Sequence, residues 1–462
     1  MKQLHLQEIL PHIGGVIIKE GLCSSFHTVI TRSNKLNSGT MFFCLNRNIG
    51  NTVTQKPFPP CIIVSDRIGR LKNLPNAATI VKVKNIKVAY QRFLSFYRRL
   101  FNIPVIAITG TYGKTTTKEM IRHILSEQYK VKATLGNYNL FRSNSSVLTR
   151  FEDQTDFGVF ELGVGKKGNL DRCCRCFGPF TAVITGIGAD HIERFGSIEN
   201  YRMEKSKILN GVGENQAAIL NADCQNTLLI SKKFTNKKIV WFGLEENADF
   251  RAHNIIYSEH SIDFQLTFNK ETFSVRIPGC GIHNVYNALA AIAAVHSNGV
   301  DIQYAIHRLE SYKHLKRHLE IVKGLKGATL IDDTWNTNSG SIQAALTVLN
   351  QLAHEKTSIA VLGKISELGA EEKNEHKKVA RMVIENQIKI LISIGNTASI
   401  ISREAIKLGM DPNRVYMCSS EIEAKNILNE LANPNSIILV KTSMRESLRS
   451  FVMSLKKQTE MM

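Results

Sequence analysis

The 462-residue sequence lacks several features that would place it in other classes of protein. No run of 18 apolar residues occurs, so we expect no transmembrane helix. The first residues, MKQLHLQEILPHIGG, contain no charged segment followed by an apolar one, and we therefore expect no signal peptide. The nine cysteines have no regular spacing, which favours free thiols in a reducing cytoplasm over disulfides or a zinc site.

The sequence also lacks a balance of charge. Its 59 basic and 40 acidic residues give a formal net charge of +19, an excess that occurs in proteins that bind nucleic acids or other anionic surfaces. The basic residues are scattered, however, without a long Lys/Arg block and with few aromatic residues among them. We therefore expect a solvated basic surface and an anionic substrate, and no nucleic-acid partner.

The order of apolar segments predicts an α/β fold in three parts. Residues 1–100 contain short apolar runs between turn-like stretches, which predicts a small α/β domain. Residues 101–312 alternate strand-like and helix-like segments, and this predicts a mostly parallel sheet with helices on both faces. Within this part, residues 250–277 alternate polar and apolar side chains, which is typical of antiparallel strands. Residues 313–462 repeat the α/β rhythm.

In the two larger parts, the candidate strands are Val105–Thr109, Gly158–Leu162, Ala182–Thr185, Ala217–Leu220, Lys238–Phe242, Ala328–Ile331, Ile359–Leu362, Ile388–Ile394 and Ile437–Val440. In a parallel sheet, ligands bind at the carboxyl ends of the strands, so polar residues that follow these segments are candidate site residues.

The most informative stretch reads ITGTYGKTTTKEM and begins two residues before Gly110. Gly110 and Gly113 allow the backbone to turn tightly, so that successive N–H groups point at phosphate oxygens. Lys114 adds a mobile positive charge at the start of a predicted helix, whose N-terminal end is itself electropositive. The hydroxyl of Thr115 or Thr116 can reach a magnesium ion. This stretch predicts a site for a nucleoside triphosphate.

Three further polar residues are candidate site residues, and each allows two interpretations. Glu161 lies near the end of the candidate strand Gly158–Leu162, in the segment GVFELG, and could hold Mg²⁺ beside the phosphates, although a carboxylate at a strand end is more often solvated. His191 is a candidate ligand or a hydrogen-bonded structural residue. Lys205 lies on a predicted helix, where a lone lysine is usually a surface group.

The later part of the chain supplies candidate contacts to the base, the ribose and the phosphates. Asn284 and Asn287 enter an alanine-rich helix and could offer amide groups to a purine ring. Asp332 and Asp333 end a candidate strand, where either carboxylate could accept from ribose hydroxyls. Arg317 could meet phosphate charge across a cleft between domains.

Taken together and in this order, these motifs resemble those of the Mur ligase superfamily. The likeness covers residues 101–450 and is strongest in GTYGKTTTKEM, ELG, HIERFGSIEN and HNVYNALAAIAA. It implies a UDP-sugar-binding N-terminal domain, a central P-loop ATPase domain and a C-terminal Rossmann-like domain. It also implies a monomeric cytoplasmic enzyme that forms amide bonds through an acyl phosphate, most similar to those that complete the peptidoglycan precursor. Its substrates would be ATP with Mg²⁺, a small carboxylate, possibly UDP-linked, and a small amine.

The resemblance also implies roles for individual residues. Lys114 would hold the β- and γ-phosphates, Thr115 and Glu161 one magnesium ion, and His191 a second metal ion. Lys205 stands where these ligases carry a carbamylated lysine, whose added oxygens ligate metal. We therefore assign catalysis to Lys114, His191 and Lys205. The remaining nucleotide contacts would be Gly110, Thr111, Gly113, Thr116, Asn287, Arg317 and Asp333, and the substrate contacts would be Asn137, Asn139 and Lys441.

The sequence departs from the family pattern mainly at substrate positions. The loop that reads GNxNNxxGxP in the family runs here from Gly136 to Ser145 without the second asparagine of the pair, the glycine or the proline. The YNANP segment has become WNTNS, which starts at Trp335. The N-terminal signature is matched only in part, by SNKLNSGTMFFCL. Three functions therefore stay open: the peptidoglycan reaction, a paralogous ligase for another acid and amine, and a non-catalytic nucleotide-binding regulator.

Overall fold

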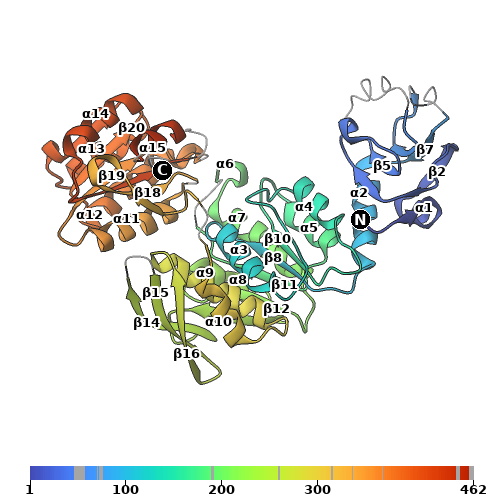
Figure 1. The fold of residues 1–462 in the computed structure, drawn as a ribbon, viewed down its shortest axis with the longest axis horizontal. Coiled ribbons are helices and arrows are strands. Elements are labelled where there is room, and N and C mark those ends of the chain that lie inside the picture. Colours follow the sequence, from blue (N-terminus) through green and yellow to red (C-terminus); the bar gives the residue numbers. More distant parts are fainter. Residues whose placement is uncertain are drawn as a thin grey trace, which may run out of the picture.

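The computed structural model of this protein describes residues 1–45, 58–69, 71, 76–188, 192–258, 261–313, 316–335, 337–366, 368–443 and 448–456. Three large sheets organise these residues into an N-terminal, a central and a C-terminal lobe, coloured blue, cyan to yellow, and orange to red in Figure 1. The expected α/β class is confirmed.

The N-terminal lobe is built on a five-stranded sheet in the order β2-β7-β6-β5-β4. Its strands are β2 (Gly15–Lys19), β4 (Thr28–Ile30), β5 (Thr40–Phe43), β6 (Cys61–Ser65) and β7 (Ala78–Val83). All pairs are parallel except β2 with β7. A small antiparallel pair, β1 (Leu4–His5) and β3 (Ser25–Phe26), lies beside helices α1 (Leu6–Ile13) and α2 (Ile86–Arg99).

Helix α2 leads from the N-terminal lobe to the central lobe. Its start is fixed by Asn85, whose side-chain oxygen accepts hydrogen bonds from two backbone N–H groups of the first turn. Its inward face carries Phe93 and Tyr97, and the Tyr97 hydroxyl donates to the carbonyl of Phe151 in the central lobe at 2.7 Å. One hydrophobic cluster therefore continues from the N-terminal sheet into the central one. The proposed domain boundary near residue 100 stays a prediction.

The central lobe contains a nine-stranded sheet in the order β16-β15-β14-β13-β12-β11-β8-β10-β9. The strands from β9 to β14 are parallel, and β15 and β16 add antiparallel pairs, as the alternation in residues 250–277 predicts. The strands are β8 (Val105–Thr109), β9 (Val131–Ala133), β10 (Phe157–Glu161), β11 (Thr181–Ile184), β12 (Ala217–Asn221), β13 (Lys238–Gly243), β14 (Phe250–Tyr257), β15 (Ser261–Phe268) and β16 (Glu271–Pro278).

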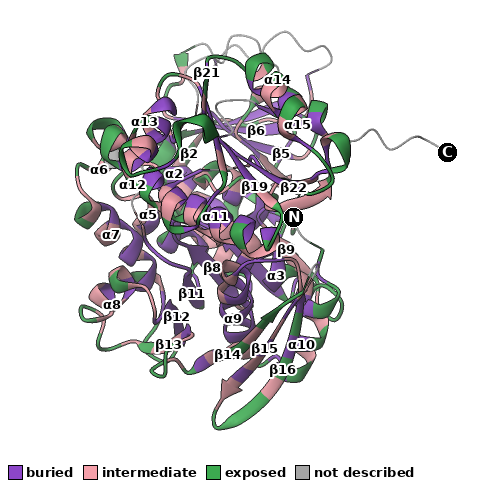
Figure 2. Ribbon diagram, turned by 90° about the vertical axis from the view of Figure 1, so that its left-hand side faces the viewer, coloured by how far each residue is buried: buried purple, intermediate pink, exposed green. Residues whose placement is uncertain are grey.

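Helices cover both faces of the central sheet, because its inner strands are apolar on both sides. In β8, Ala107 packs with one hydrophobic cluster and Ile106 and Ile108 pack with the other, and Figure 2 shows these strands buried. The helices are α3 (Lys114–Leu125), α4 (Phe141–Leu148), α5 (Asn169–Phe177), α6 (Ile192–Phe195), α7 (Ile198–Ser206), α8 (Gln225–Ser231), α9 (Ile282–His296) and α10 (Ile302–Glu310).

The C-terminal lobe contains a six-stranded sheet in the order β17-β18-β22-β19-β20-β21, parallel except for β17. Its strands are β17 (Glu320–Lys323), β18 (Thr329–Asp333), β19 (Thr357–Leu362), β20 (Ile390–Ile394), β21 (Val415–Cys418) and β22 (Ser436–Lys441). Helices α11 (Ser339–Ala353), α12 (Glu372–Glu385) and α13 (Ser399–Lys407) cover one face, and α14 (Glu421–Leu431) and α15 (Arg449–Leu455) cover the other.

Each candidate strand of the two larger parts coincides with an observed strand, with ends that differ by at most two residues. The sequence analysis missed β9, β17 and β21. Strands β9 and β17 have no fully buried residue, and β21 exposes Met417 in its middle, so none of the three forms the continuous apolar run that identifies an inner strand. Among the described helices, none combines the length and the apolar character that a membrane span needs.

The aromatic packing between β10 and α5 gives a test of the central core. Phe177 is fully buried and stacks on Phe160, with ring centroids 5.1 Å apart. We expect Phe177→Ala to lower the free energy of unfolding by about 3–5 kcal/mol, because the change removes buried surface and leaves a cavity. The measurement is urea unfolding followed by circular dichroism. Phe180→Ala is the matched control, since Phe180 is 41% exposed, and an equal loss in both variants would contradict the assignment.

Candidate active site

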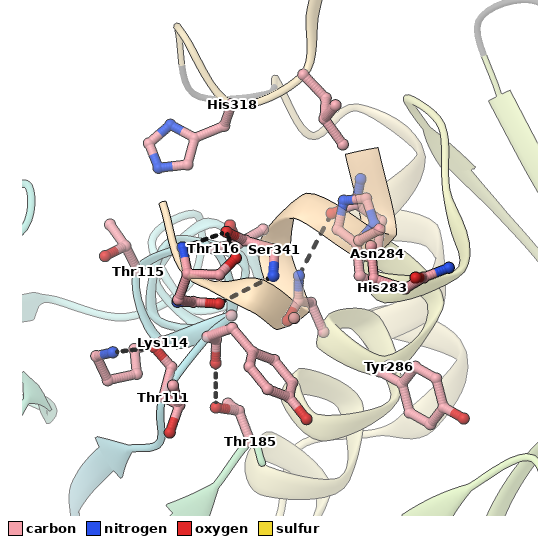
Figure 3. A pocket seen from close by; sticks show the side chains of 18 of the residues that line it. Thr111, Lys114, Thr115, Thr116, Thr185, His283, Asn284, Tyr286, His318 and Ser341 are labelled. Atoms are coloured by element: carbon pink, nitrogen blue, oxygen red, sulfur yellow. Dashed lines mark hydrogen bonds between the residues drawn. The ribbon is translucent and has the colours of Figure 1, made fainter. Parts of the chain in front are cut away.

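A cavity of about 450 Å³ lies between the central and C-terminal lobes, and Figure 3 shows its lining. The central lobe contributes the carboxyl ends of four neighbouring strands, β12, β11, β8 and β10. The C-terminal lobe contributes the ends of β18 and β22 and the start of α11. Of the predicted site residues, those that line the cavity are Thr111, Gly113, Lys114, Thr115, Thr116, Asn137, Asn139, Glu161, Asn284, Asn287, Asp333 and Lys441.

The glycine turn between β8 and α3 tolerates no side chain at either glycine. Gly113 has φ of 75°, and a Cβ there would lie 2.3 Å from Oδ1 of Asn287. Gly110 has φ of 148°, and a Cβ there would lie 2.1 Å from Oγ1 of Thr185. The turn is therefore packed directly against two polar side chains, which is why glycine is needed at both positions.

Backbone hydrogen bonds fix the turn to the segment that follows β11. The Thr111 N–H donates to the carbonyl of Gly186 at 2.7 Å, and the Thr111 hydroxyl accepts from the Gly188 N–H at 3.0 Å. The Thr185 hydroxyl donates to the carbonyl of Tyr112 at 2.5 Å. These contacts fix the conformation of the turn, and the first N–H groups of α3, which lack partners within the helix, can bind an anion.

Lys114 is the first residue of α3, and its ammonium folds back over the turn. Its Nζ donates to the carbonyl of Thr111 at 2.9 Å, as the dashed line in Figure 3 shows. The side chain is half-buried and lines the cavity. A cation and a helix N-terminus therefore meet at one point, which suits the phosphate groups of a nucleotide.

Glu161, the last residue of β10, is buried and presents both carboxylate oxygens to neighbours. Oε2 accepts from the Thr115 hydroxyl at 2.8 Å, and Oε1 accepts from the Asn139 amide at 2.8 Å. Within the described residues, no three His, Cys, Asp or Glu side chains gather around one point. One carboxylate with one hydroxyl fits Mg²⁺, which takes few protein ligands and completes its shell with water and phosphate oxygens.

Lys205 on α7 lies behind the glycine turn and outside the cavity lining. Its buried ammonium donates to the carbonyl of Gly110 at 2.7 Å and to the Thr109 hydroxyl at 3.3 Å. It thereby holds the end of β8 and the start of the turn. His191, the predicted second metal ligand, lies outside the described residues.

Asn287 on α9 stands at the predicted base-binding side of the cavity. Its Oδ1 accepts from the Thr117 hydroxyl at 3.2 Å, and its amide nitrogen lies 3.4 Å from Oδ1 of Asn284. Asn284 in turn donates to the carbonyl of Cys280 at 2.8 Å. This chain of amides joins α9 to α3 and leaves polar edges on the cavity wall.

Asp333 and Lys441 form an ion pair on the opposite wall. They end the neighbouring parallel strands β18 and β22, where the register places them side by side. The Lys441 ammonium lies 2.7 Å from Oδ2 of Asp333, and both residues are buried. Asp332 points elsewhere, to Lys456 at 2.9 Å. Of the two carboxylates that the sequence offers as ribose ligands, only Asp333 lines the cavity.

Arg317 lies near the cavity without lining it. Its guanidinium donates to the carbonyl of Thr334 at 2.8 Å and stacks over the Trp335 ring at 5.2 Å. The neighbouring His318 does line the cavity, as Figure 3 shows, and contacts the same indole ring. Burial lowers the pKa of His318, so its imidazole is neutral at physiological pH.

The structure brings further residues to the cavity that the sequence analysis did not select. Asp223 follows β12 and accepts from the Leu244 N–H at 2.6 Å and from the Tyr286 hydroxyl at 2.8 Å. Its place just after a buried strand is the same signal that identified Glu161. Tyr112 also lines the cavity, and burial raises the pKa of its hydroxyl to about 12.

The loop that carries Asn137 and Asn139 is held by a buried lysine. Lys118 on α3 donates to the carbonyls of Thr134 and Gly136, each at 2.8 Å, and pairs with Glu119. The loop is thus tied to the same helix that follows the glycine turn. Both asparagines line the cavity with Glu161 and Lys114, and Asn139 donates to Glu161.

Comparisons with known proteins agree with this geometry. Residues 108–295 match the Mur ligase middle domain, and residues 317–444 match the glutamate ligase domain of Mur ligases. The UDP-N-acetylmuramoyl-tripeptide–D-alanyl-D-alanine ligase of Escherichia coli (strain K12) is 31% identical over 321 residues, 69% of this chain and 71% of that protein. The ligase of the same name from Bacillus subtilis (strain 168) is 29% identical over 433 residues, 93% of each chain. A crystal structure of MurF from Acinetobacter baumannii superposes with a TM-score of 0.86 at 26% identity and covers 98% of both chains.

The packing of the glycine turn predicts the effect of a single methyl group. Gly113→Ala would place Cβ against Asn287 and strain a left-handed backbone, so we expect at least a tenfold loss of affinity for a fluorescent ATP analogue. Equilibrium fluorescence titration measures this affinity. Gly69→Ala is the control, because no atom of the described residues lies within 4 Å of a Cβ at Gly69. Unchanged affinity in Gly113→Ala would show that the turn does not hold the nucleotide.

Proposed function

Because this chain belongs to the Mur ligase family, we propose that it joins D-alanyl-D-alanine to a UDP-N-acetylmuramoyl-tripeptide with cleavage of ATP, in the cytoplasmic stage of peptidoglycan synthesis. Membership of this family makes the chain an ATP-dependent ligase rather than a non-catalytic nucleotide-binding regulator. One observation carries the proposal. Lys114 and Glu161 line one wall of the cavity, and the Asp333–Lys441 ion pair lines the opposite wall.

The proposed reaction has two steps that balance. An oxygen of the tripeptide carboxylate forms a bond to the γ-phosphorus of ATP, the bond from that phosphorus to the bridging oxygen breaks, and ADP leaves. The free amine of the dipeptide then bonds to the carbonyl carbon of the acyl phosphate. The carbon–oxygen bond to phosphate breaks, and one amine proton leaves with inorganic phosphate. Both steps transfer negative charge between oxygens, so the site must present clustered positive charge.

The central lobe offers that positive charge. We propose that Lys114 and the N–H groups at the start of α3 bind the β- and γ-phosphates. The remaining residues at the phosphates would be Gly110, Thr111, Gly113 and Thr116, which shape the turn and the start of the helix. Mg²⁺ held by Thr115 and Glu161 would neutralise phosphate charge when bound. Lys205, by its contact with the Gly110 carbonyl, positions the turn in this structure, and its carbamylation remains a prediction.

The remaining predicted contacts divide between the two walls. Asn287 would bind the adenine edge, and Asp333 a ribose hydroxyl. Lys441 would face the acyl phosphate or the incoming dipeptide, since its ammonium is already desolvated beside Asp333. Arg317 would act on the phosphates only by releasing its contacts with Thr334.

A second cationic site, between the N-terminal and central lobes, supports a UDP-linked substrate. Arg142 on α4 donates from Nη2 to the carbonyl of Thr31 at 3.4 Å, and burial together with the nearby Arg32 lowers the pKa of its guanidinium. Two like charges held together favour a binding anion that carries more than one charge. The diphosphate of a UDP-sugar has that chemistry.

A specific observation keeps the paralogous ligase as a second candidate. The loop between β9 and α4 exposes Leu135, Tyr138 and Leu140, which are 60%, 67% and 62% accessible. Three exposed apolar side chains beside Asn137 and Asn139 would suit an apolar group on the acid substrate. This candidate shares the ATP chemistry and differs only in the acid and the amine.

The first test concerns the phosphate-binding lysine. We expect Lys114→Ala to lower phosphate release, with ATP, UDP-N-acetylmuramoyl-tripeptide and D-alanyl-D-alanine present, by about 10²–10³-fold, because the charge that develops on the phosphoryl group loses its nearest cation. A coupled phosphate-release assay measures the rate. Lys238→Ala, at an exposed position that starts β13, should keep the full rate. A wild-type enzyme that is inactive with this pair but active with another acid and amine would favour the paralogue.

The second test concerns the UDP-linked substrate. We expect Arg142→Ala to raise the KM for that substrate at least tenfold and to leave the KM for ATP unchanged, because Arg142 lies away from the nucleotide cavity. Initial rates at varied concentrations of each substrate separate the two constants. Arg150→Ala, just beyond the end of the same helix at an exposed position, is the control. Equal effects on both KM values would contradict the assignment.

A further inference from the structure

A second cavity, of about 360 Å³, lies on the outer side of helix α2, away from the active-site cavity. It is formed where α2 meets α1 and α5, so it spans the contact between the N-terminal and central lobes. The lining residues come from these three helices and are His12, Val88, Gln91, Arg92, Ser95, Arg99, Arg175 and Cys176. None of them belongs to the proposed ligase site.

The rim of this cavity is basic. Arg92 and Arg99 project from α2 and Arg175 projects from α5, all at exposed positions. The His12 ring packs on the Phe96 ring with centroids 4.2 Å apart, which holds the imidazole beside α2. Three guanidinium groups and one imidazole from three helices therefore surround one hollow.

No carboxylate of the described residues pairs with these arginines. Elsewhere in the described structure, arginines such as Arg122 and Arg276 lie within 2.7 Å of an acidic oxygen. Asp171, one helical turn before Arg175, is engaged by Lys207 at 2.9 Å instead. The cavity thus concentrates positive charge without an internal counter-charge.

The surroundings of the cavity add to this imbalance. The Arg98 guanidinium, on the inner side of the same helix, is satisfied by carbonyls alone, including those of Phe177 at 2.8 Å and Phe101 at 2.7 Å. Cys176 forms part of the floor, but burial raises the pKa of its thiol to about 11, so it remains neutral at physiological pH. Neither group offsets the charge of the rim.

We propose that this cavity is a binding site for a small phosphate-bearing anion. Arginine forks bind phosphate oxygens in pairs, and three forks around one hollow can engage a dianion or a diphosphate from several sides. Gln91 also lines the cavity, while the Ser95 hydroxyl donates to the carbonyl of Arg175 at 3.0 Å. A solvated basic surface would distribute such charges over convex ground, whereas these three arginines line one hollow.

The ligand would sit against the helix that connects two lobes. Helix α2 buries aromatic side chains on its inner face and presents Arg92 and Arg99 on its outer face. An anion that bridges Arg92 on α2 and Arg175 on α5 would relieve repulsion between them and tighten the contact of the two helices. The proposal is independent of the ligase reaction.

The test measures binding of inorganic pyrophosphate to two matched variants of the full chain by isothermal titration calorimetry. One carries Arg92→Gln, Arg99→Gln and Arg175→Gln; the other carries Arg150→Gln, Arg381→Gln and Arg403→Gln, three exposed arginines that do not line the cavity. Both also carry Lys114→Ala, so that weakened binding at the phosphate turn is common to both. Net charge is therefore equal, and circular dichroism checks that both fold.

We expect pyrophosphate to bind the cavity variant at least tenfold more weakly than the control variant. A single Arg175→Gln change should weaken binding at least threefold, which keeps the test valid if the triple variant misfolds. Co-sedimentation with phosphatidylglycerol vesicles forms a second arm. If the two variants differ in vesicle binding but bind pyrophosphate equally in calorimetry, the phosphate belongs to a lipid headgroup. Equal behaviour of the variants in both arms would overturn the proposal.

Discussion

The proposed active site depends on how closely the turn from Gly110 to Gly113 approaches the side chains of Thr185 and Asn287. This approach is possible because β8 and β11 are direct neighbours in the sheet, and because α9 packs tightly on α3. The buried face of α9 is rich in alanine, and small side chains let two helices come close together. The position of this glycine turn is therefore set by core packing that begins well away from the cavity.

The same sheet geometry brings the other groups of the site together. Thr109, Glu161 and Asn221 are the last residues of three parallel strands that lie in one region of the sheet. Asp333 and Lys441 end two paired strands of a different sheet and face the first group across the cavity. A ligase must bring a nucleotide, an acid and an amine to one point. The strand ends of two sheets that face each other across one cavity can offer contacts to all three.

The strong positive charge of this chain has a partial structural explanation. Some basic groups are internal supports: Lys118 holds the loop that carries Asn137 and Asn139, and Lys205 holds the glycine turn at Gly110. Others gather where an anion would be bound, at Lys114, at Arg142 and along the outer face of α2. Charge that is scattered along the sequence is thus collected at a few places in space, because helices and strand ends bring distant residues together.

The sequence alone determined the α/β class, most inner strands and the glycine turn before Lys114, because these depend on local signals. A short apolar run bounded by turn residues, such as the one before Gly110, indicates a buried strand, and closely spaced glycines allow the tight backbone turn that follows it. Only the tertiary structure decided which of Asp332 and Asp333 faces the cavity, that Asp223 and Tyr286 line it, and that Arg92 and Arg175 line one second cavity. These relations depend on strand register and on helices that pack across long stretches of chain, and neither is encoded in a short window of residues.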